Sequence, residues 1–164
     1  MHRATTHSAA LRRLTLAFII AAMASGCQGS SDSPVAPNIT STTFAAALGI
    51  NLNASTKTAT GLYYRDLLAG TGTAVSSGNV LTVRYTGWFT NGTQFDTNQS
   101  ATGFGFTIGA GQVISGWDQG LIGMKVGGRR QLIIPPALGY GTAGSGSIPG
   151  NSILVFTVDV LTAR

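Results

Sequence analysis

Apolar and polar residues alternate along short stretches of the chain after Gly61, which is the two-residue period of half-buried β-strands. The clearest stretches are residues 61–70, 80–89 and 152–163. In the second stretch, Leu81, Val83 and Tyr85 share one face of the predicted strand. The third stretch predicts a strand with one face made by Ile153, Val155, Thr157 and Asp159 and the other by Leu154, Phe156, Val158 and Val160. An Asn-Gly pair within residues 90–96 predicts a hairpin turn.

A helical period occurs only at residues 113–124, VISGWDQGLIGM. Leu121 follows Trp117 at i+4, which gives one apolar stripe along a short helix. Ser115 can cap this helix, because Asp118 follows three residues later as in a capping box. Taken alone, such a stripe more often belongs to an ordinary core than to a binding site.

These elements together define a fold class. Several short strands, one short helix and 23 glycines predict an α+β fold in which a five- to six-stranded antiparallel sheet wraps around the helix. The length of 164 residues accommodates one such domain with additional segments. We assign the domain to residues 61–164.

The N-terminal part has a different composition. Arg3, Arg12 and Arg13 precede an apolar run at residues 14–24, which is typical of a secretion signal and too short to span a bilayer comfortably. The run ends in ASGC, residues 24–27, which resembles the lipobox of bacterial lipoproteins, in which the cysteine receives the lipid. An ordinary signal peptide followed by an unrelated cysteine is the alternative.

We therefore predict a lipoprotein signal peptide at residues 1–26 and a second segment at residues 27–60. This second segment comprises the lipidated Cys27, a flexible Ser/Thr/Pro-rich tether to about residue 43, and a short arm. The protein is then expected to be exported and held on a bacterial membrane by the lipid on Cys27. Gln28 after the cysteine favours an outer membrane facing the periplasm, if the host has two membranes.

Charge and residue content exclude several classes of function. The formal charge of +5 comes mostly from the leader, since loss of residues 1–26 leaves seven Lys and Arg against five Asp. His2 and His7 leave with the leader as well, and the chain has no glutamate. The processed protein therefore lacks the residues of Ser-His-Asp and Cys-His nucleophile systems and of zinc sites. We expect no metal, no organic cofactor and no nucleic-acid partner.

One motif matches a nucleotide-binding fingerprint by its letters alone. GYGTAG at residues 139–144 fits G-x-G-x-x-G, but that fingerprint needs a helix to start within it. Pro149 and further glycines follow instead, so no helix can begin. We predict a wide loop with Tyr140 at its root.

Three longer stretches resemble the FKBP-type peptidyl-prolyl cis-trans isomerases in order and spacing. They are VRYTGWFTNGTQFD at 83–96, GQVISGWDQGLIGMKVGGRRQLIIPPALGYG at 111–141 and IPGNSILVFTVDVL at 148–161. The resemblance covers about residues 61–164 and implies the FKBP-like fold, a sheet on a short helix, in agreement with the pattern above.

The resemblance also implies a set of site residues. Carried over by position, the catalytic residues are Tyr85, Asp96, Ile114, Trp117 and Tyr140, and the substrate-binding residues are Phe95, Phe104, Val113, Ile148 and Phe156. In the family the tryptophan forms the pocket floor. The Ile114 N–H and the Tyr140 hydroxyl would donate hydrogen bonds to the substrate, and Asp96 would accept one within the pocket.

The resemblance implies an enzyme that accelerates X-Pro isomerisation in exported proteins by stabilising the twisted amide without covalent chemistry. Its expected partners are proline-containing polypeptides and FK506- or rapamycin-like macrolides, and we expect a monomer. The alternative is a non-catalytic proline-peptide binding module or weak chaperone, because a fold does not by itself fix activity. Turnover of a proline peptide separates the two hypotheses.

Overall fold

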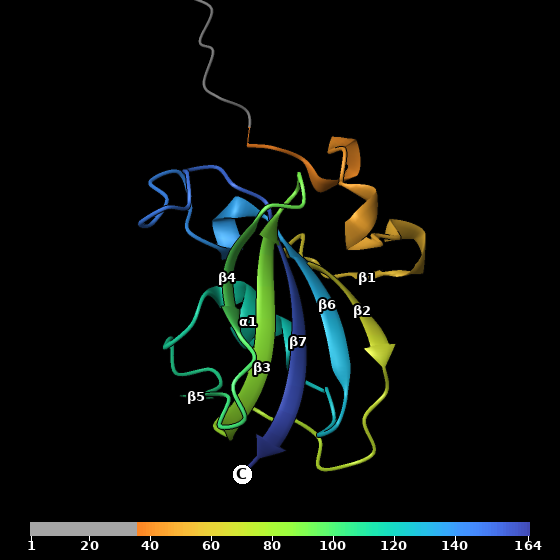
Figure 1. Ribbon diagram of the computed structural model, residues 1–164, viewed down its shortest axis with the longest axis vertical. Helices are drawn as coiled ribbons and strands as arrows, with labels where there is room; N and C mark the ends of the chain where they lie inside the picture. Colours follow the sequence, from red (N-terminus) through yellow and green to blue (C-terminus); the bar gives the residue numbers. More distant parts are fainter. Residues whose placement is uncertain (1–35) are drawn as a thin grey trace, which may run out of the picture. The chain divides into compact units, whose positions relative to one another are not determined.

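The computed structural model describes residues 36–164, and β-strands dominate this part of the chain (Figure 1). One α-helix, α1, covers Ser115–Gly120. The strands are β1 (Thr56–Lys57), β2 (Tyr63–Leu68), β3 (Val80–Phe89), β4 (Gln94–Asn98), β5 (Phe104–Thr107), β6 (Arg129–Ile134) and β7 (Leu154–Ala163). The short 3-10 helices are η1 (Ile39–Ser41), η2 (Ala46–Leu48), η3 (Leu52–Ala54) and η4 (Pro136–Leu138).

The strands form one antiparallel sheet with β3 and β7 at its centre. The order is β1-β2-β6-β7-β3-β4, and β5 pairs with the first half of β3, beside the half that pairs with β4. The predicted fold class is confirmed. Seven strands are found instead of five or six because residues 99–103 interrupt one edge and because β1 adds two residues at the other.

The predicted hairpin joins β3 and β4. The Phe89 N–H donates to the Thr93 carbonyl at 2.9 Å, and the Gly92 N–H donates to the Phe89 carbonyl at 3.0 Å. Gly92 has φ of 87°, which glycine adopts without the cost that a Cβ would add. The turn is therefore a three-residue loop with a left-handed glycine, one of the common hairpin connections.

The main core lies between the sheet and α1, which covers the far face in Figure 1. Trp117 and Leu121 enter it from the helix, as the apolar stripe predicts. The predicted capping box is wrong. Helix α1 begins at Ser115 with Ile114 as its N-cap and has no side-chain cap, and the Asp118 carboxylate instead accepts hydrogen bonds from the N–H groups of Gly109 and Gly111.

A second apolar cluster lies on the other face of the sheet. It contains Ile39, Tyr63, Ile133, Ile153 and Val155, with Phe44, Leu48, Ile50, Leu52 and Trp88 packed around it. Residues 36–57, which we call the arm, supply five of these side chains and lie at the upper end of the sheet (orange to yellow in Figure 1). We predicted a flexible tether to about residue 43, but Ile39 is only 4% exposed. The sequence pattern missed this because one buried isoleucine in a polar stretch has no period.

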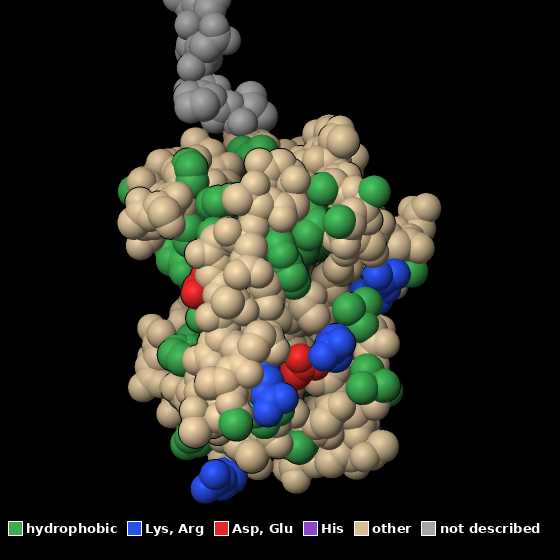
Figure 2. All heavy atoms as spheres, in the orientation of Figure 1, with side chains coloured by type: hydrophobic (Ala, Val, Ile, Leu, Met, Phe, Trp, Pro, Cys, Tyr) green, Lys and Arg blue, Asp and Glu red, His purple; other side chains and the backbone are tan. Residues whose placement is uncertain are grey.

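The rest of this face is polar. Arg84, Asp159 and Arg129 are cross-strand neighbours on β3, β7 and β6, and Arg129 donates to both Asp159 carboxylate oxygens at 2.6 and 3.1 Å. Figure 2 shows Lys or Arg and Asp or Glu side chains gathered on the lower half of the face, while hydrophobic side chains lie mainly above. The arm thus covers the apolar part of this face, whose exposure to water would be unfavourable.

The predicted signal peptide and Cys27 lie outside the described residues. Within residues 36–164, no helix has the length and apolar character needed to cross a membrane. The described residues all belong to one compact unit.

Truncating the buried isoleucine of the arm should destabilise the whole domain. Ile39→Ala is expected to lower the free energy of unfolding by about 2 to 5 kcal/mol, because it removes buried methyl groups and leaves a cavity. Urea denaturation of residues 28–164 measures this. The matched control is Thr43→Ala, an exposed position in the same segment, for which we expect a change within about 0.5 kcal/mol. Equal stability of Ile39→Ala and the parent would contradict the packed arm.

Candidate active site

Helix α1 lies unusually close to the sheet, and this closeness places Trp117. A Cβ built on Gly116 would lie 2.6 Å from the Ile134 side chain of β6, so only glycine permits the approach. At the other end of the helix, Arg130 is 5% exposed and donates to the carbonyls of Gly120 and Ile122 at 2.8 and 3.2 Å. Arg130 also makes a bidentate pair with Asp66 at 2.6 and 3.0 Å. Both ends of the helix are therefore fixed against the sheet.

Trp117 sits at the centre of an aromatic cluster and is only 4% exposed. The rings of Tyr85 and Phe156 meet it edge to face, with centroids 5.0 and 5.3 Å away. Phe106 and Phe104 stand at 5.7 and 6.5 Å. Such edge-to-face pairs add stabilisation beyond the buried area, so the cluster is a rigid surface.

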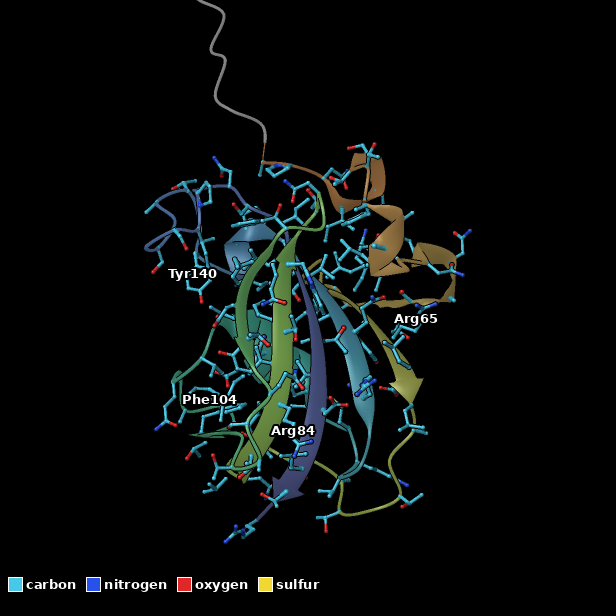
Figure 3. All side chains as sticks on the ribbon, in the orientation of Figure 1. Arg65, Arg84, Phe104 and Tyr140 are labelled. Carbon is cyan, nitrogen blue, oxygen red and sulfur yellow. The ribbon has the colours of Figure 1, made fainter. Side chains whose placement is uncertain are left out.

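A pocket opens over this tryptophan. Its empty volume of about 320 Å³ is at the small end of ligand sites, which suits one ring and the groups beside it. Phe104 from β5 and Tyr140 from the loop after η4 lie along the same side of the molecule in Figure 3. The lining residues are Tyr85, Asp96, Phe104, Val113, Ile114, Trp117, Tyr140 and Phe156.

The structure therefore brings together all five predicted catalytic residues and three of the five predicted binding residues. Phe95 and Ile148 are not among the lining residues. Phe95 lies behind the wall, with its ring 5.5 Å from that of Phe156, and Ile148 packs partly buried against the main core. The roles that we assigned to these ten residues remain predictions.

Two contributors were missed from the sequence. Phe106 contacts Trp117, the floor of the site, with ring centroids 5.7 Å apart. Gly87 on β3 leaves room for the aromatic rings of the pocket wall, since a Cβ there would lie 2.7 Å from the rings of both Phe95 and Phe156. Neither has a sequence signal of its own, because both depend on which rings the strands bring together.

Tyr85 and Asp96 are joined by a hydrogen bond across the β3–β4 pair. The Tyr85 hydroxyl donates to the Asp96 carboxylate at 2.8 Å, and the other carboxylate oxygen accepts from the Thr97 N–H at 2.8 Å. Burial, followed by this hydrogen bond, raises the pKa of Tyr85 well above its ordinary value of 10.0. The Tyr85 hydroxyl thus stays protonated and hydrogen-bonded to the Asp96 carboxylate, and this bond holds Asp96 in place.

Tyr140 has a different part in the pocket. Burial, followed by the charge of Asp96, raises the pKa of its hydroxyl, so the phenol is neutral at physiological pH. Its hydroxyl makes no hydrogen bond to another described residue, and the same holds for the Ile114 N–H. The pocket therefore offers two donors above an apolar floor.

The loop that carries Ile114 is held from the helix. The Asp118 carboxylate binds the Gly109 N–H at 2.7 Å and the Gly111 N–H at 3.3 Å, and the Gln112 side chain binds the Thr107 N–H at 2.8 Å. These bonds connect the end of β5 to the start of α1. The Ile114 N–H is consequently held at the pocket rim by α1 itself.

Residues 36–164 show no sign of a metal site or a nucleotide-binding site. These residues contain no cluster of three metal-ligating side chains, and histidine and cysteine occur only in the part of the chain not described. GYGTAG lies in a loop of turns in which no helix starts, and an isolated bridge between Ser145 and Ile148 follows it. Nucleotide binding through a helix N-terminus is thus excluded for this motif.

The fold and this aromatic pocket are those of an FKBP-type prolyl isomerase. The sequence profile of the FKBP-type peptidyl-prolyl cis-trans isomerase family matches residues 71–161, and the chain belongs to this family.

Individual relatives agree with the assignment. The chain is 47% identical over 106 residues to an FK506-binding protein of Neisseria meningitidis serogroup B, covering 62% of this chain and 94% of that protein. It is 48% identical over 108 residues to FK506-binding protein 4 of Gibberella zeae, covering 66% of this chain but 22% of the fungal protein. The chain thus spans about a fifth of such fungal relatives. The crystal structure of FkpA from Escherichia coli matches with a TM-score of 0.63 and 38% identity, over 68% of this chain and 52% of that one.

Because the pKa of Tyr85 is raised, the free energy of unfolding should fall at alkaline pH. The folded protein holds this proton more tightly than the unfolded chain, in which tyrosine ionises near pH 10.0. The contribution is therefore complete below pH 10 and declines as the pH rises above it. Chemical denaturation at pH 8, 9, 10 and 11 should show a steeper loss of stability above pH 10 in the parent than in Tyr85→Phe. Parallel curves would contradict the assignment.

Proposed function

We propose that this protein accelerates cis-trans isomerisation of X-Pro bonds in polypeptides. The observation that carries the proposal is the pocket over Trp117, in which an apolar floor lies beneath two hydrogen-bond donors, the Ile114 N–H and the Tyr140 hydroxyl. Membership of the FKBP-type isomerase family supports it. The FK506-binding names of the relatives support a second proposal, that macrolides of that kind occupy the same pocket.

The chemistry suits a site without a nucleophile. Twisting an X-Pro bond sacrifices amide resonance, at a barrier of about 18 to 20 kcal/mol. The planar amide is the more dipolar state, so moving the bond from water into an apolar pocket disfavours the planar form relative to the twisted one. Each tenfold acceleration requires only about 1.4 kcal/mol of this difference.

Each pocket residue then has a definite part. Trp117 receives the proline ring, and Phe104 and Phe156 form its walls with Val113. The Ile114 N–H and the Tyr140 hydroxyl donate to substrate carbonyls and fix the peptide on either side of the bond. Tyr85 holds Asp96, whose carboxylate keeps negative charge at the rim without transferring a proton. Phe95 supports the Phe156 wall from behind, and Ile148 packs against the main core.

Prolyl exchange measured by NMR tests the proposal directly. Residues 28–164, which include every described contact, should accelerate cis-trans exchange in an Ala-Leu-Pro-Phe peptide. Trp117→Ala should reduce kcat/KM by about a hundredfold or more through loss of the floor, and Tyr140→Phe by about threefold to tenfold through loss of one neutral hydrogen bond.

A matched control is Tyr63→Phe, which removes a hydroxyl from the opposite face of the sheet and should leave kcat/KM within twofold of the parent. If the folded parent leaves the exchange rate at its uncatalysed value, the isomerase proposal fails and proline-peptide binding without turnover replaces it. Titration with FK506 would then show whether the pocket still binds a ligand.

We further propose that the protein is a monomeric lipoprotein, attached to a bacterial membrane through Cys27 and acting on exported proteins. The supporting observations are the charged and apolar leader, the ASGC sequence and the polar composition of residues 28–35. From Cys27 to Ala36 the chain can reach at most about 30 Å. Such an anchor would hold the catalytic domain close to the membrane surface.

Replacing the cysteine tests the anchor separately from the catalysis. Cys27→Ser in the full chain, expressed in a bacterial host, should move the protein from the detergent phase to the aqueous phase in Triton X-114 partition. Activity per folded molecule should stay unchanged, because every residue that lines the pocket lies between Tyr85 and Phe156 in the chain. The control is Ser30→Ala, which should remain in the detergent phase. Detergent partition that is unaffected by Cys27→Ser would overturn the lipid anchor.

A further inference from the structure

The arm is joined to the sheet by polar bonds as well as by its apolar side chains. The Gln131 side chain donates to the Leu48 carbonyl at 2.8 Å, and Arg65 donates to the Gly49 carbonyl at 2.8 Å. These two bonds fix the middle of the arm over β6 and β2. Since Gln131 is buried, this attachment is part of the folded core rather than a loose contact.

One further bond links the arm to the β3–β4 hairpin. The Ala45 N–H donates to the Thr90 carbonyl at the tip of the β3–β4 hairpin, at 2.8 Å. A Cβ built on Gly92 in the same turn would lie 3.1 Å from the Ala45 Cβ, so the arm lies directly against the turn. Strand β4 is an edge strand with β3 as its one neighbour, so the arm supplies a second attachment for it.

The β3–β4 hairpin is connected to the pocket through packed aromatic rings. Phe89 packs on Phe95 with tilted rings whose centroids are 4.9 Å apart, and Phe95 meets Phe156 of the pocket wall edge to face at 5.5 Å. The next residue, Asp96, lines the pocket and receives the Tyr85 hydroxyl. A shift of the hairpin therefore moves one wall and the carboxylate of the site together.

We propose that the arm, residues 36–57, is a positioning element of the active site, which holds β4 through the Ala45–Thr90 hydrogen bond and thereby places Phe95 and Asp96. This inference rests on the proposed isomerase function. The arm lies outside the matched family region, residues 71–161. None of its residues touches the pocket, so its effect is indirect.

A pair of proline substitutions tests the proposal. Ala45 has φ of −59°, which a proline ring accepts, so Ala45→Pro removes the one N–H that binds Thr90. Ala46→Pro is the matched control, because Ala46 is the exposed first residue of η2, where proline is well tolerated and the Ala45 N–H remains. We expect Ala45→Pro to lower kcat/KM about fivefold to tenfold and Ala46→Pro to stay within twofold.

Two further readouts separate positioning from a general loss of stability. In a Tyr85→Phe background, where Asp96 has already lost its side-chain partner, the additional effect of Ala45→Pro should shrink to less than twofold. Amide hydrogen exchange of residues 94–98 should be at least tenfold faster in folded Ala45→Pro, with β6 unchanged. A purely structural role would instead give the same fold-loss in both backgrounds and overturn the proposal.

The exchange measurement does not depend on catalysis. An inactive parent would refute the proposed function, while the exchange of β4 would still report whether the arm holds the hairpin. An active parent with unaltered β4 exchange and unaltered kcat/KM in folded Ala45→Pro would refute the positioning role alone.

Discussion

The approach of α1 to the sheet is the constraint on which the rest of the structure depends. Without a side chain at Gly116 the helix packs against Ile134, and this sets the depth at which Trp117 lies beneath the aromatic rings. Arg130 fixes the opposite end through the free carbonyls of the helix terminus, which a short helix cannot satisfy internally. A six-residue helix has little stability of its own, so its position is determined by the sheet.

The same packing explains how a site with so few functional groups can be effective. Charged groups at the pocket are limited to Asp96, which is already bonded to Tyr85 and to the Thr97 backbone. The remaining surface is aromatic and rigid, and its two donors are held by a loop and a helix start. Selectivity for a twisted amide over a planar one needs fixed geometry and low polarity more than acid-base strength.

Much of this could be predicted from the sequence, and the exceptions have physical causes. Alternation identified the paired strands because one face of each is buried, as with Leu81 and Val83. The pocket residues followed from family resemblance, and the structure brings eight of the ten together. The role of Asp118 was mistaken because the S-x-x-D pattern does not reveal that loop N–H groups at Gly109 and Gly111 compete for the carboxylate. The short arm was predicted, but its packing on the sheet was not, because its partners on β6 and β7 are about a hundred residues away in the chain.

The position of β7 in the sheet has a consequence for biosynthesis. This strand pairs with both β3 and β6, yet it follows every other described strand along the chain (Figure 1). A nascent chain that has not yet emerged from the ribosome as far as β7 has no strand to join β3 to β6, and both apolar clusters lack the side chains that β7 supplies. Completion of the sheet and of both clusters during translation therefore has to wait until β7 is free to pair.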